Sequence, residues 1–212
     1  MPKIYLLNSD KFENIQNLPV IKINFFQIKI DFDLYDALIF TSKNAVRAIE
    51  NIDKKWREKE IYSIGKGTSK EINRHDANLI YTARNSYGNT FADEIKSKLQ
   101  GKKVLFPRAK IVTSKLNKIL LDCGISLDEK ILYETTCESI DKKNKPKKNS
   151  VIIFTSPSTV NCFLKNFDWD KSYEAICIGK VTAKAIPNGI KIQFSDEQTI
   201  KSCIAKAKQI ID

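Results

Sequence analysis

Short apolar runs that give way to helical spacing recur along this chain and outline its architecture. In Leu38–Ile49 the sequence LIFTSKNAVRAI begins with aliphatic and aromatic residues, passes through Thr-Ser, and continues with apolar residues at helical spacing. Ile152–Leu164, IIFTSPSTVNCFL, follows the same order. Each stretch predicts a buried strand that turns directly into a helix, because the apolar period changes from that of a strand to that of a helix.

A second repeated motif follows each copy of the first. Tyr62–Ile72 and Cys177–Ile186 both contain an apolar strand, then Ile-Gly-Lys, a threonine and a helix. The two Thr-Ser motifs lie 114 residues apart, and so do the two Ile-Gly-Lys motifs. Two motifs that repeat at one offset indicate two homologous α/β domains in one chain.

Strands and helices alternate through both repeats. In the first repeat the expected order is strand Ala37–Thr41, helix Lys43–Ile52, strand Ile61–Ile64, helix Thr68–Arg74, strand Asn78–Tyr81, helix Thr90–Leu99, strand Lys103–Phe106 and helix Thr113–Asp122. In the second it is strand Val151–Thr155, helix Ser158–Asn166, strand Ala175–Ile178, helix Thr182–Ile186, strand Lys191–Phe194 and helix Thr199–Ile211. This alternation predicts parallel sheets with right-handed crossovers, and Gly101 and Gly124 are expected to end helices.

The second repeat lacks one strand and one helix that the first contains. The N-terminal segment has the required pattern, since strand Ile4–Leu7 precedes a brief helical segment near Lys11–Asn17, and we predict that it completes the C-terminal domain. The chain must then cross between domains twice. Val20–Ile30 and Lys130–Thr136 fall at the crossings and alternate apolar with polar residues, as half-exposed strands do.

The predicted fold class is α/β, with two similar parallel-sheet domains joined by a two-stranded β-ladder linker. Residues 1–20 and 140–212 are expected to form a discontinuous domain, and residues 32–129 a domain inserted in it. Residues 21–31 and 130–139 are the expected linker strands. A chain of 212 residues suits two small domains of this kind.

The composition is that of an ordinary soluble globular protein, with 42% hydrophobic and 29% charged residues. No apolar run approaches the ~20 residues of a membrane span. The opening sequence, MPKIYLLNSD, has too short an apolar run for a signal peptide and continues with charged residues. We therefore expect a cytoplasmic protein with no membrane partner.

Cysteine and histidine usage argues against several kinds of site. The five cysteines are odd in number and include no close pair, which argues against a disulfide framework and a zinc site: Cys123, Cys137, Cys162, Cys177 and Cys203. We expect them to be reduced and mostly buried. The single histidine, His75, is expected in a surface turn at a helix end, so a histidine-based triad is not expected.

The net charge of +11 favours an anionic partner: nucleic acid, a phosphorylated metabolite or a polycarboxylate. The Lys-rich run Lys142–Lys148 contains a proline and no apolar residue, so we interpret it as a solvated linker, with an electrostatic gate as the alternative. It contains no aromatic residue, whereas single-strand nucleic-acid sites combine basic with aromatic side chains. No nucleic-acid partner is expected.

The repeated motifs fall where parallel α/β sheets bind ligands, beyond the carboxyl ends of the strands. They supply hydroxyls and backbone N–H groups at helix starts, which hold carboxylates or phosphates. The candidate substrate-binding residues are Thr41, Ser42, Lys43, Gly65, Lys66, Gly67, Thr68, Thr155, Ser156, Pro157, Ser158, Gly179, Lys180 and Thr182. The alternative is that Ser42, Thr68, Ser158 and Thr182 are only N-caps, a role worth ~1 kcal/mol each.

Cofactor motifs are missing from these turns. There is no Walker-type phosphate loop, and Gly65-Lys66-Gly67 leads to Thr68 without the third glycine of a dinucleotide fingerprint. No pair of acidic residues has a plausible metal spacing. We expect chemistry without a metal and without a bound cofactor.

The order of the motifs LIFTSKNAV, YSIGKGTS, KVLFPRAK, ILYETT, VIIFTSPSTV and ICIGKVTAKAI resembles the uroporphyrinogen-III synthase family, and the similarity spans nearly the whole chain. The resemblance implies two α/β domains joined by a two-stranded linker. It also implies cyclisation of the linear tetrapyrrole hydroxymethylbilane to uroporphyrinogen III, with loss of water, inversion of ring D and no cofactor.

Carried over motif by motif, the family's binding loops fall on the candidate residues given above, and its linker tyrosine falls on Tyr133. Lys43 stands where Pro157 stands in the second copy and where relatives often have proline, so it adds a cation whose direct contact with substrate is open. Tyr133 is the one expected catalytic residue, a neutral donor to the departing hydroxyl group. The alternative is that its ring only packs in the linker ladder.

The implied substrate suits the predicted site. Hydroxymethylbilane carries eight carboxylates, and a site rimmed by helix N-termini, hydroxyls and lysines can distribute that charge. The linear chain must be held curled, so positioning should account for much of the catalysis. We expect a monomer with a small-molecule substrate. The alternative function is a non-catalytic two-domain binder of an anionic metabolite.

Overall fold

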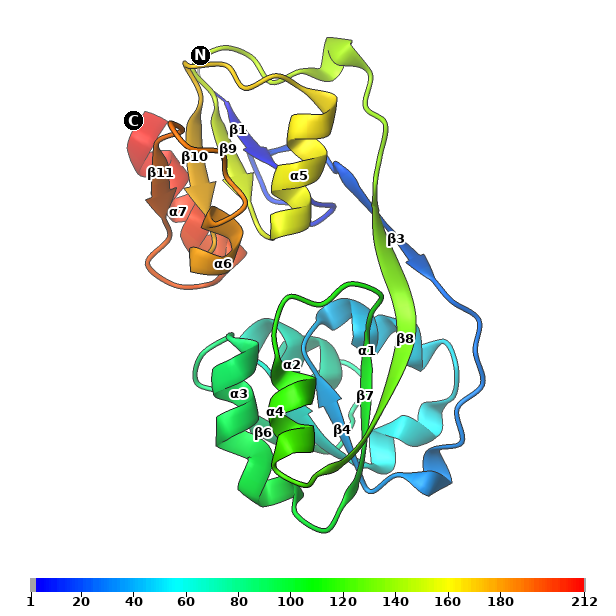
Figure 1. The fold of residues 1–212 in the computed structure, drawn as a ribbon. Helices are drawn as coiled ribbons and strands as arrows, with labels where there is room; N and C mark the ends of the chain where they lie inside the picture. The colour runs from blue at the N-terminus through cyan, green and yellow to red at the C-terminus, as the bar shows by residue number, and fades with distance from the viewer. Residues whose placement is uncertain (1–2, 212) are drawn as a thin grey trace. The chain divides into compact units, whose positions relative to one another are not determined.

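The computed structural model describes residues 3–211 and contains two compact units, each with its own sheet (Figure 1). Unit 1 comprises the described parts of Met1–Lys22 and Thr135–Asp212, and unit 2 comprises Ile23–Glu134. The outermost limits of the predicted discontinuous domain, at residues 1, 2 and 212, lie outside the described residues. Within them, no helix is long and apolar enough to cross a membrane.

The sheet of unit 2 has the strand order β3-β8-β7-β4-β5-β6. Its strands are β3 Ile21–Phe25, β4 Ala37–Phe40, β5 Glu60–Ser63, β6 Leu79–Thr82, β7 Lys103–Ala109 and β8 Ser126–Cys137. The pairs β4–β5, β4–β7, β5–β6 and β7–β8 are all parallel. The parallel arrangement expected from alternating strands and helices is confirmed.

Helices cover both faces of this sheet (Figure 1). They are α1 Lys43–Glu50, α2 Lys66–Asn73, α3 Gly88–Ile95 and α4 Leu116–Asp122, with the 3-10 segments η1 Phe32–Leu34, η2 Lys54–Glu58 and η3 Lys96–Leu99. Successive side chains of β4 point to opposite faces. Leu38 and Phe40 pack in one cluster with residues of α1 and α2, whereas Ala37 and Ile39 pack in another with residues of α3 and α4. All four are fully buried, as the apolar run predicts.

Unit 1 repeats this design on a smaller scale, with strand order β11-β10-β9-β1-β2. Its elements are β1 Ile4–Leu6, β2 Gln16–Asn17, η4 Lys142–Asn144, β9 Val151–Phe154, α5 Pro157–Asn166, β10 Glu174–Cys177, α6 Lys180–Ala183, β11 Ile192–Phe194 and α7 Ile200–Ile211. Ile152 and Phe154 pack with residues of α5, and Val151 and Ile153 pack with residues of α7. The N-terminal strand β1 pairs in parallel with β9, between β9 and β2.

One predicted helix is wrong. The segment Lys11–Asn17 forms a turn followed by the short strand β2. Asn14 has a φ of 59°, in the left-handed region that a right-handed helix excludes. The Asn17 amide donates hydrogen bonds to the carbonyls of Asn8 and Asp10, at 2.9 and 2.8 Å, so side chains take over backbone groups here.

The predicted strand Val20–Ile30 is shorter than expected, because β3 ends at Phe25. Most other differences from the predicted elements are shifts of a few residues at helix ends, where the sequence pattern is least informative. The stop predicted at Gly124 is confirmed: its φ is 78°, its N–H donates to Leu121, and the N–H of Ile125 donates to Leu120, which is a Schellman motif. Gly101, at φ 75°, likewise follows η3.

The cysteine prediction is wrong for one pair. Cys137, the last residue of β8, forms a disulfide with Cys162 of α5, with a Cα–Cα distance of 5.1 Å. The two are 25 residues apart in sequence, and only the fold brings them together. A covalent loop of this length stabilises a folded unit by roughly 3–4 kcal/mol in the chain-entropy model. Cys123, Cys177 and Cys203 are free, as expected.

The Lys-rich run and the single histidine lie where the sequence predicts them. The run Lys142–Lys148 is exposed except for Pro146. His75 lies in the turn after α2, with its ring 6.0 Å from that of Trp56 and its Nδ1 3.7 Å from a carboxylate oxygen of Glu50. The histidine therefore packs against Trp56 of η2 and lies near the Glu50 carboxylate.

Candidate functional site

The first pair of candidate loops lies at the carboxyl edge of the unit 2 sheet, on neighbouring strands. Thr41-Ser42-Lys43 follows β4, and Gly65 to Thr68 follows β5. Phe40 pairs with Ser63 at the ends of these strands, and the N–H of Ile64 donates to the Phe40 carbonyl at 2.9 Å. The loops leave the sheet side by side because the strands are parallel and adjacent.

Unit 1 contains the equivalent pair. Thr155 to Ser158 follows β9, and Gly179 to Thr182 follows β10. Phe154 pairs with Cys177, and the N–H of Ile178 donates to the Phe154 carbonyl at 3.0 Å. Each unit thus brings together the two candidate loops that the repeated motifs supply.

The observed helix caps differ from the expected ones at three of the four helices. Ser42 does cap α1, accepting a hydrogen bond from the Asn44 N–H at 3.1 Å. The cap of α5 is Ser156, which forms a capping box with Thr159, so the cap role considered for Ser158 is wrong.

The cap roles considered for Thr68 and Thr182 are also wrong. The caps of α2 and α6 are Gly65 and Gly179, which have no side chain to cap with. Each threonine is the third residue of its helix, and the two are 7% and 3% exposed. Because a glycine occupies each cap position, the threonine hydroxyl groups do not cap these helices and remain candidates for ligand binding.

Close approach explains the glycines at these caps. Gly65 and Gly179 have extended backbones that other residues can adopt. A Cβ on Gly65 would lie 2.5 Å from the Ser86 hydroxyl, and one on Gly179 would lie 2.8 Å from the Gln198 amide nitrogen. The loops before α3 and α7 therefore press against the glycine turns in their respective units. Ser86 and Gln198 could not be predicted from the sequence because neither belongs to a repeated motif.

Buried hydroxyl groups form hydrogen bonds with one another and with the glycine turn of unit 2. The Ser69 hydroxyl lies 3.0 Å from the Ser63 hydroxyl, 2.8 Å from that of Thr82 and 3.2 Å from the Gly65 carbonyl. Ser63 is fully buried and Ser69 is 8% exposed. A satisfied buried network of this kind holds the backbone of the turn in one conformation.

Tyr133 joins the unit 2 site through Ser42. The tyrosine is 5% exposed, and its ring packs edge-on against Phe25 with centroids 6.4 Å apart. Burial raises the pKa of its hydroxyl, while a hydrogen bond with the Ser42 side chain lowers it, as a donor to the phenolic oxygen does. The Ser42 hydroxyl oxygen also accepts a hydrogen bond from the Asn44 N–H at 3.1 Å.

The electrostatics of the four helix starts favours an anion. None of α1, α2, α5 and α6 has an acidic residue in its first turn. Lys43, Lys66 and Lys180 each begin a helix, and the last two are exposed. The partial positive charge at a helix start is worth about 0.3–1 kcal/mol to an anion, although α6 is only one turn long and contributes less.

Across residues 3–211, no group of three or more His, Cys, Asp and Glu side chains could hold a metal ion. Polar loops at the carboxyl edge of parallel sheets, next to helix starts and basic residues, are the arrangement with which α/β proteins commonly bind anionic ligands.

Comparisons with known proteins identify the family. The family model for uroporphyrinogen-III synthase HemD matches residues 11–205. The crystal structure of uroporphyrinogen-III synthetase from Helicobacter pylori is similar with a TM-score of 0.83 and 28% identity, covering 99% of this chain and 100% of that one. A mutant uroporphyrinogen III synthase from Thermus thermophilus, at 11% identity and a TM-score of 0.60, covers 100% of this chain and 99% of that one and shares the fold. No curated protein sequence gives a significant match.

The chain belongs to the uroporphyrinogen-III synthase family. It is therefore an enzyme, a cyclising lyase of porphyrin biosynthesis, and the resemblance drawn from the order of its motifs is confirmed.

Proposed function

We propose that the candidate loops of both units bind the carboxylates of hydroxymethylbilane while the chain cyclises it to uroporphyrinogen III, with inversion of ring D and loss of water. One observation carries the proposal. Each unit has one serine turn and one glycine turn, and the helix that follows each turn has no acidic residue in its first turn. Eight carboxylates need several such positions, and a repeated fold provides them twice.

The positions of the residues support the following proposed roles. Backbone N–H groups and hydroxyls at Thr41-Ser42, Gly65 to Thr68, Thr155 to Ser158 and Gly179 to Thr182 are assigned to carboxylate binding, with Lys43, Lys66 and Lys180 adding positive charge. Holding the linear chain curled brings its reacting ends together, which replaces a search in solution by a positioned encounter. Tyr133 donates its phenolic proton to the departing hydroxyl group.

The proposed architecture is that of two domains. Residues 1–20 and 140–212 are proposed to form one domain and residues 32–129 the other, and the segments 21–31 and 130–139, which contain β3 and most of β8, to link them as a β-ladder. The support is the division of the chain into two compact units and the adjacency of β3 and β8. We further propose a cytoplasmic monomer with no nucleic-acid partner, since its basic side chains are accounted for by an anionic substrate.

Product analysis tests the function directly. Hydroxymethylbilane is supplied to the purified protein, and the oxidised products are separated by chromatography. The bilane closes spontaneously to the I isomer, so formation of the III isomer is the expected and diagnostic result. Exclusive formation of the I isomer, with hydroxymethylbilane still bound, would assign the chain to a non-catalytic binder.

Binding should weaken with salt. Exposed charges are screened over about 8–10 Å at ordinary ionic strength, and the proposed carboxylate sites lie at helix starts with exposed lysines. We expect KM to rise several-fold between low salt and 0.5 M salt with a smaller change in kcat. A KM independent of salt would argue for recognition through the apolar pyrrole rings.

Threonine hydroxyls at the third helical position should contribute to binding. Thr68→Val and Thr182→Val remove one hydroxyl each at nearly constant volume. We expect KM to rise about fivefold for each, equivalent to about 1 kcal/mol for one hydrogen bond. Thr159→Val is the matched control, because Thr159 is the third residue of α5 and its hydroxyl is used in the capping box. The control should lower the melting temperature and leave KM unchanged, and the opposite pattern would contradict the assignment.

A further inference from the structure

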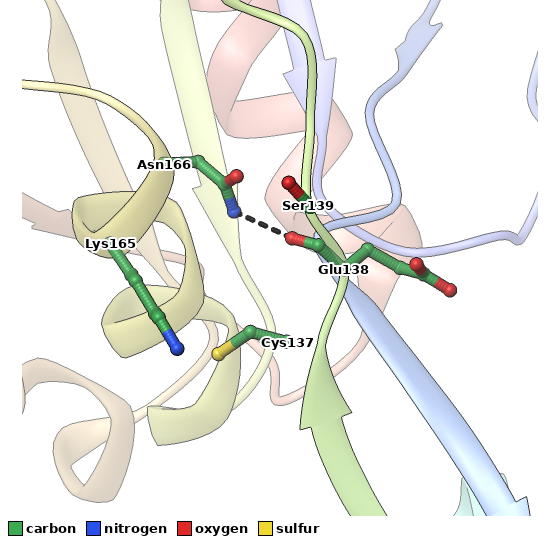
Figure 2. Close-up of a pocket in the computed structure, with 5 residues that line it drawn as sticks. All are labelled: Cys137, Glu138, Ser139, Lys165 and Asn166. Atoms are coloured by element: carbon green, nitrogen blue, oxygen red, sulfur yellow. Dashed lines mark hydrogen bonds between the residues drawn. The ribbon is translucent and has the colours of Figure 1, made fainter.

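One half of the disulfide in unit 1 is open to solvent. Cys137 is exposed, whereas Cys162 is 4% exposed on the buried side of α5. A pocket of about 270 Å³ lies beside the exposed half, lined by Cys137, Glu138, Ser139, Lys165 and Asn166 (Figure 2). Exposed disulfides are the ones that exchange with small thiols, whereas enclosed ones resist them.

The pocket contains a cationic side chain, that of Lys165, near the Cys137 sulfur (Figure 2). Lys165 lies one turn after Cys162 on the same helix and is exposed. Figure 2 shows its side chain extending into the pocket toward the Cys137 sulfur, while the Glu138 carboxylate extends away from that sulfur. A neighbouring ammonium favours the thiolate form of a cysteine and attracts an anionic reagent.

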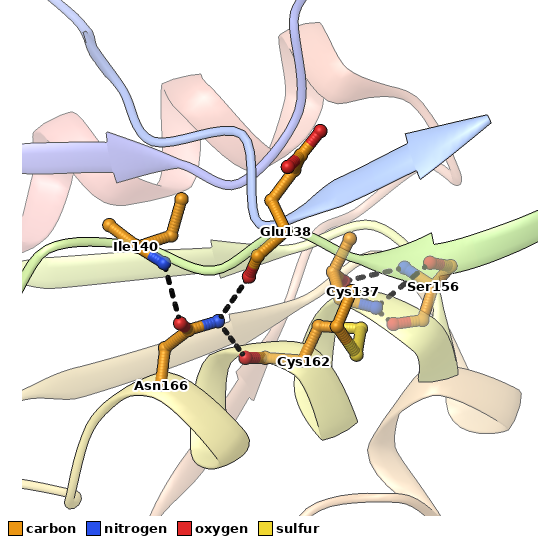
Figure 3. The surroundings of a disulfide bond; sticks show 7 residues. Cys137, Glu138, Ile140, Ser156, Cys162 and Asn166 are labelled. Carbon is orange, nitrogen blue, oxygen red and sulfur yellow. Dashed lines mark hydrogen bonds between the residues drawn. A yellow bond between two sulfur atoms is a disulfide. The ribbon is translucent and has the colours of Figure 1, made fainter.

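Asn166 holds the two cysteines in register independently of the S–S bond (Figure 3). Its amide nitrogen donates to the carbonyls of Glu138 and Cys162, both at 2.8 Å, and its amide oxygen accepts from the Ile140 N–H at 2.8 Å. The side chain of Asn166 is largely buried, with the residue 8% exposed. After reduction this clamp keeps the segment after β8 against α5, so the two thiols remain neighbours and can be rejoined.

We infer that Cys137 is a site of reversible thiol–disulfide exchange with an anionic low-molecular-weight thiol that occupies this pocket, and that Cys162 is the resolving cysteine. The inference does not depend on the substrate or on the catalytic role of any residue.

Oxidation takes place in two balanced steps. The Cys137 thiolate attacks one sulfur of a small-molecule disulfide, forms a mixed disulfide, and releases one equivalent of the small thiol as thiolate. Cys162, after losing its proton, attacks the Cys137 sulfur, forms the protein disulfide and releases the second equivalent. The two protein sulfurs are oxidised and the small-molecule disulfide is reduced by two electrons. Reduction runs the same steps in reverse, with attack on the Cys137 sulfur and Cys162 as the leaving group.

Trapping the mixed disulfide tests the inference. The full-length Cys162→Ser variant is reduced, treated with oxidised glutathione at pH 7, quenched and mapped by mass spectrometry. We expect one glutathione per chain on Cys137, formed at least tenfold faster than on Cys123, a half-buried free cysteine that serves as the internal control. Equal rates at Cys123 and Cys137 would overturn the inference and leave the disulfide with a structural role only.

The charge of the pocket supplies a second measurement. In the same background, Lys165→Glu should slow the reaction with oxidised glutathione at least threefold and speed the reaction with cystamine, which is cationic. Loss of both reactions to the same extent would indicate a structural effect and would overturn the role of the pocket. Should Cys162→Ser fail to fold, the wild-type protein gives the test: native disulfide that glutathione cannot reduce without denaturant contradicts the inference.

Discussion

Replacing Tyr133 by phenylalanine should lower kcat by about tenfold or more and leave the III isomer as the product. The substitution keeps the ring that packs against Phe25 and removes only the hydroxyl that Ser42 contacts. Positioned general acids typically contribute ~10²–10⁴-fold, and the low end applies here because the electron-rich pyrrole already expels its hydroxyl group readily. Ring inversion depends on how the bound bilane is held, so the isomer should not change.

The pKa of Tyr133 gives this prediction a pH dependence. Burial raises the pKa of the hydroxyl above the usual value near 10, because it penalises the phenolate. The donor form is then complete at neutral pH, and loss of Tyr133-dependent turnover is expected only as the pH rises beyond about 10. A pH–rate profile of the wild-type and Tyr133→Phe enzymes measures this difference.

Tyr35 is the matched control in the same unit. Like Tyr133 it is 5% exposed, and its hydroxyl donates to Asp128 at 3.0 Å. Tyr35→Phe should cost about 1 kcal/mol of stability for one lost hydrogen bond and leave kcat unchanged. Near-normal turnover of Tyr133→Phe would assign Tyr133 to packing, and equal losses in both variants would indicate a general effect on unit 2.

The sequence predicted the sheets because their strands carry a strong local signal. The runs at β4 and β9 are fully buried on both faces, and continuous apolar runs are typical of parallel strands between two helical layers. The 114-residue repeat also located the four loops, since one motif marks the same turn in each unit. These features depend on neighbours in sequence, which a sequence shows directly.

Features that depend on contacts between distant residues escaped the sequence analysis. Nothing in the spacing of Cys137 and Cys162 marks them as partners, because the end of β8 meets α5 only in the folded unit. The loop residues Ser86 and Gln198 reach glycines more than ten positions away through the arrangement of the strands. The helix expected at Lys11–Asn17 failed for a local reason, because Asn14 adopts a left-handed conformation that the apolar spacing does not indicate.

Deleting residues 1–18 should unfold unit 1 while unit 2 stays folded. The deletion removes both β1 and β2 and therefore leaves β9 at the edge of a sheet that keeps only β9, β10 and β11. It also removes five aliphatic side chains that are each at most 7% exposed, namely Ile4, Leu6, Leu7, Ile15 and Leu18. Burial of one such side chain is worth about 1.5–3 kcal/mol, so their loss amounts to roughly 10 kcal/mol. A whole domain is stable by only about 5–15 kcal/mol.

Hydrogen exchange read by mass spectrometry measures the outcome unit by unit, because amides in an unfolded unit lose their protection. In the deletion variant we expect α5 and β10 to exchange at the rate of an unfolded chain and β4 and β5 to remain protected. The fragment Ile23–Glu134, made alone, is the control, and it should melt cooperatively because its two core clusters consist of its own residues. Protected α5 amides in the deletion variant would show that the N-terminal strand is dispensable for unit 1, and an unfolded fragment would show that unit 2 does not fold on its own.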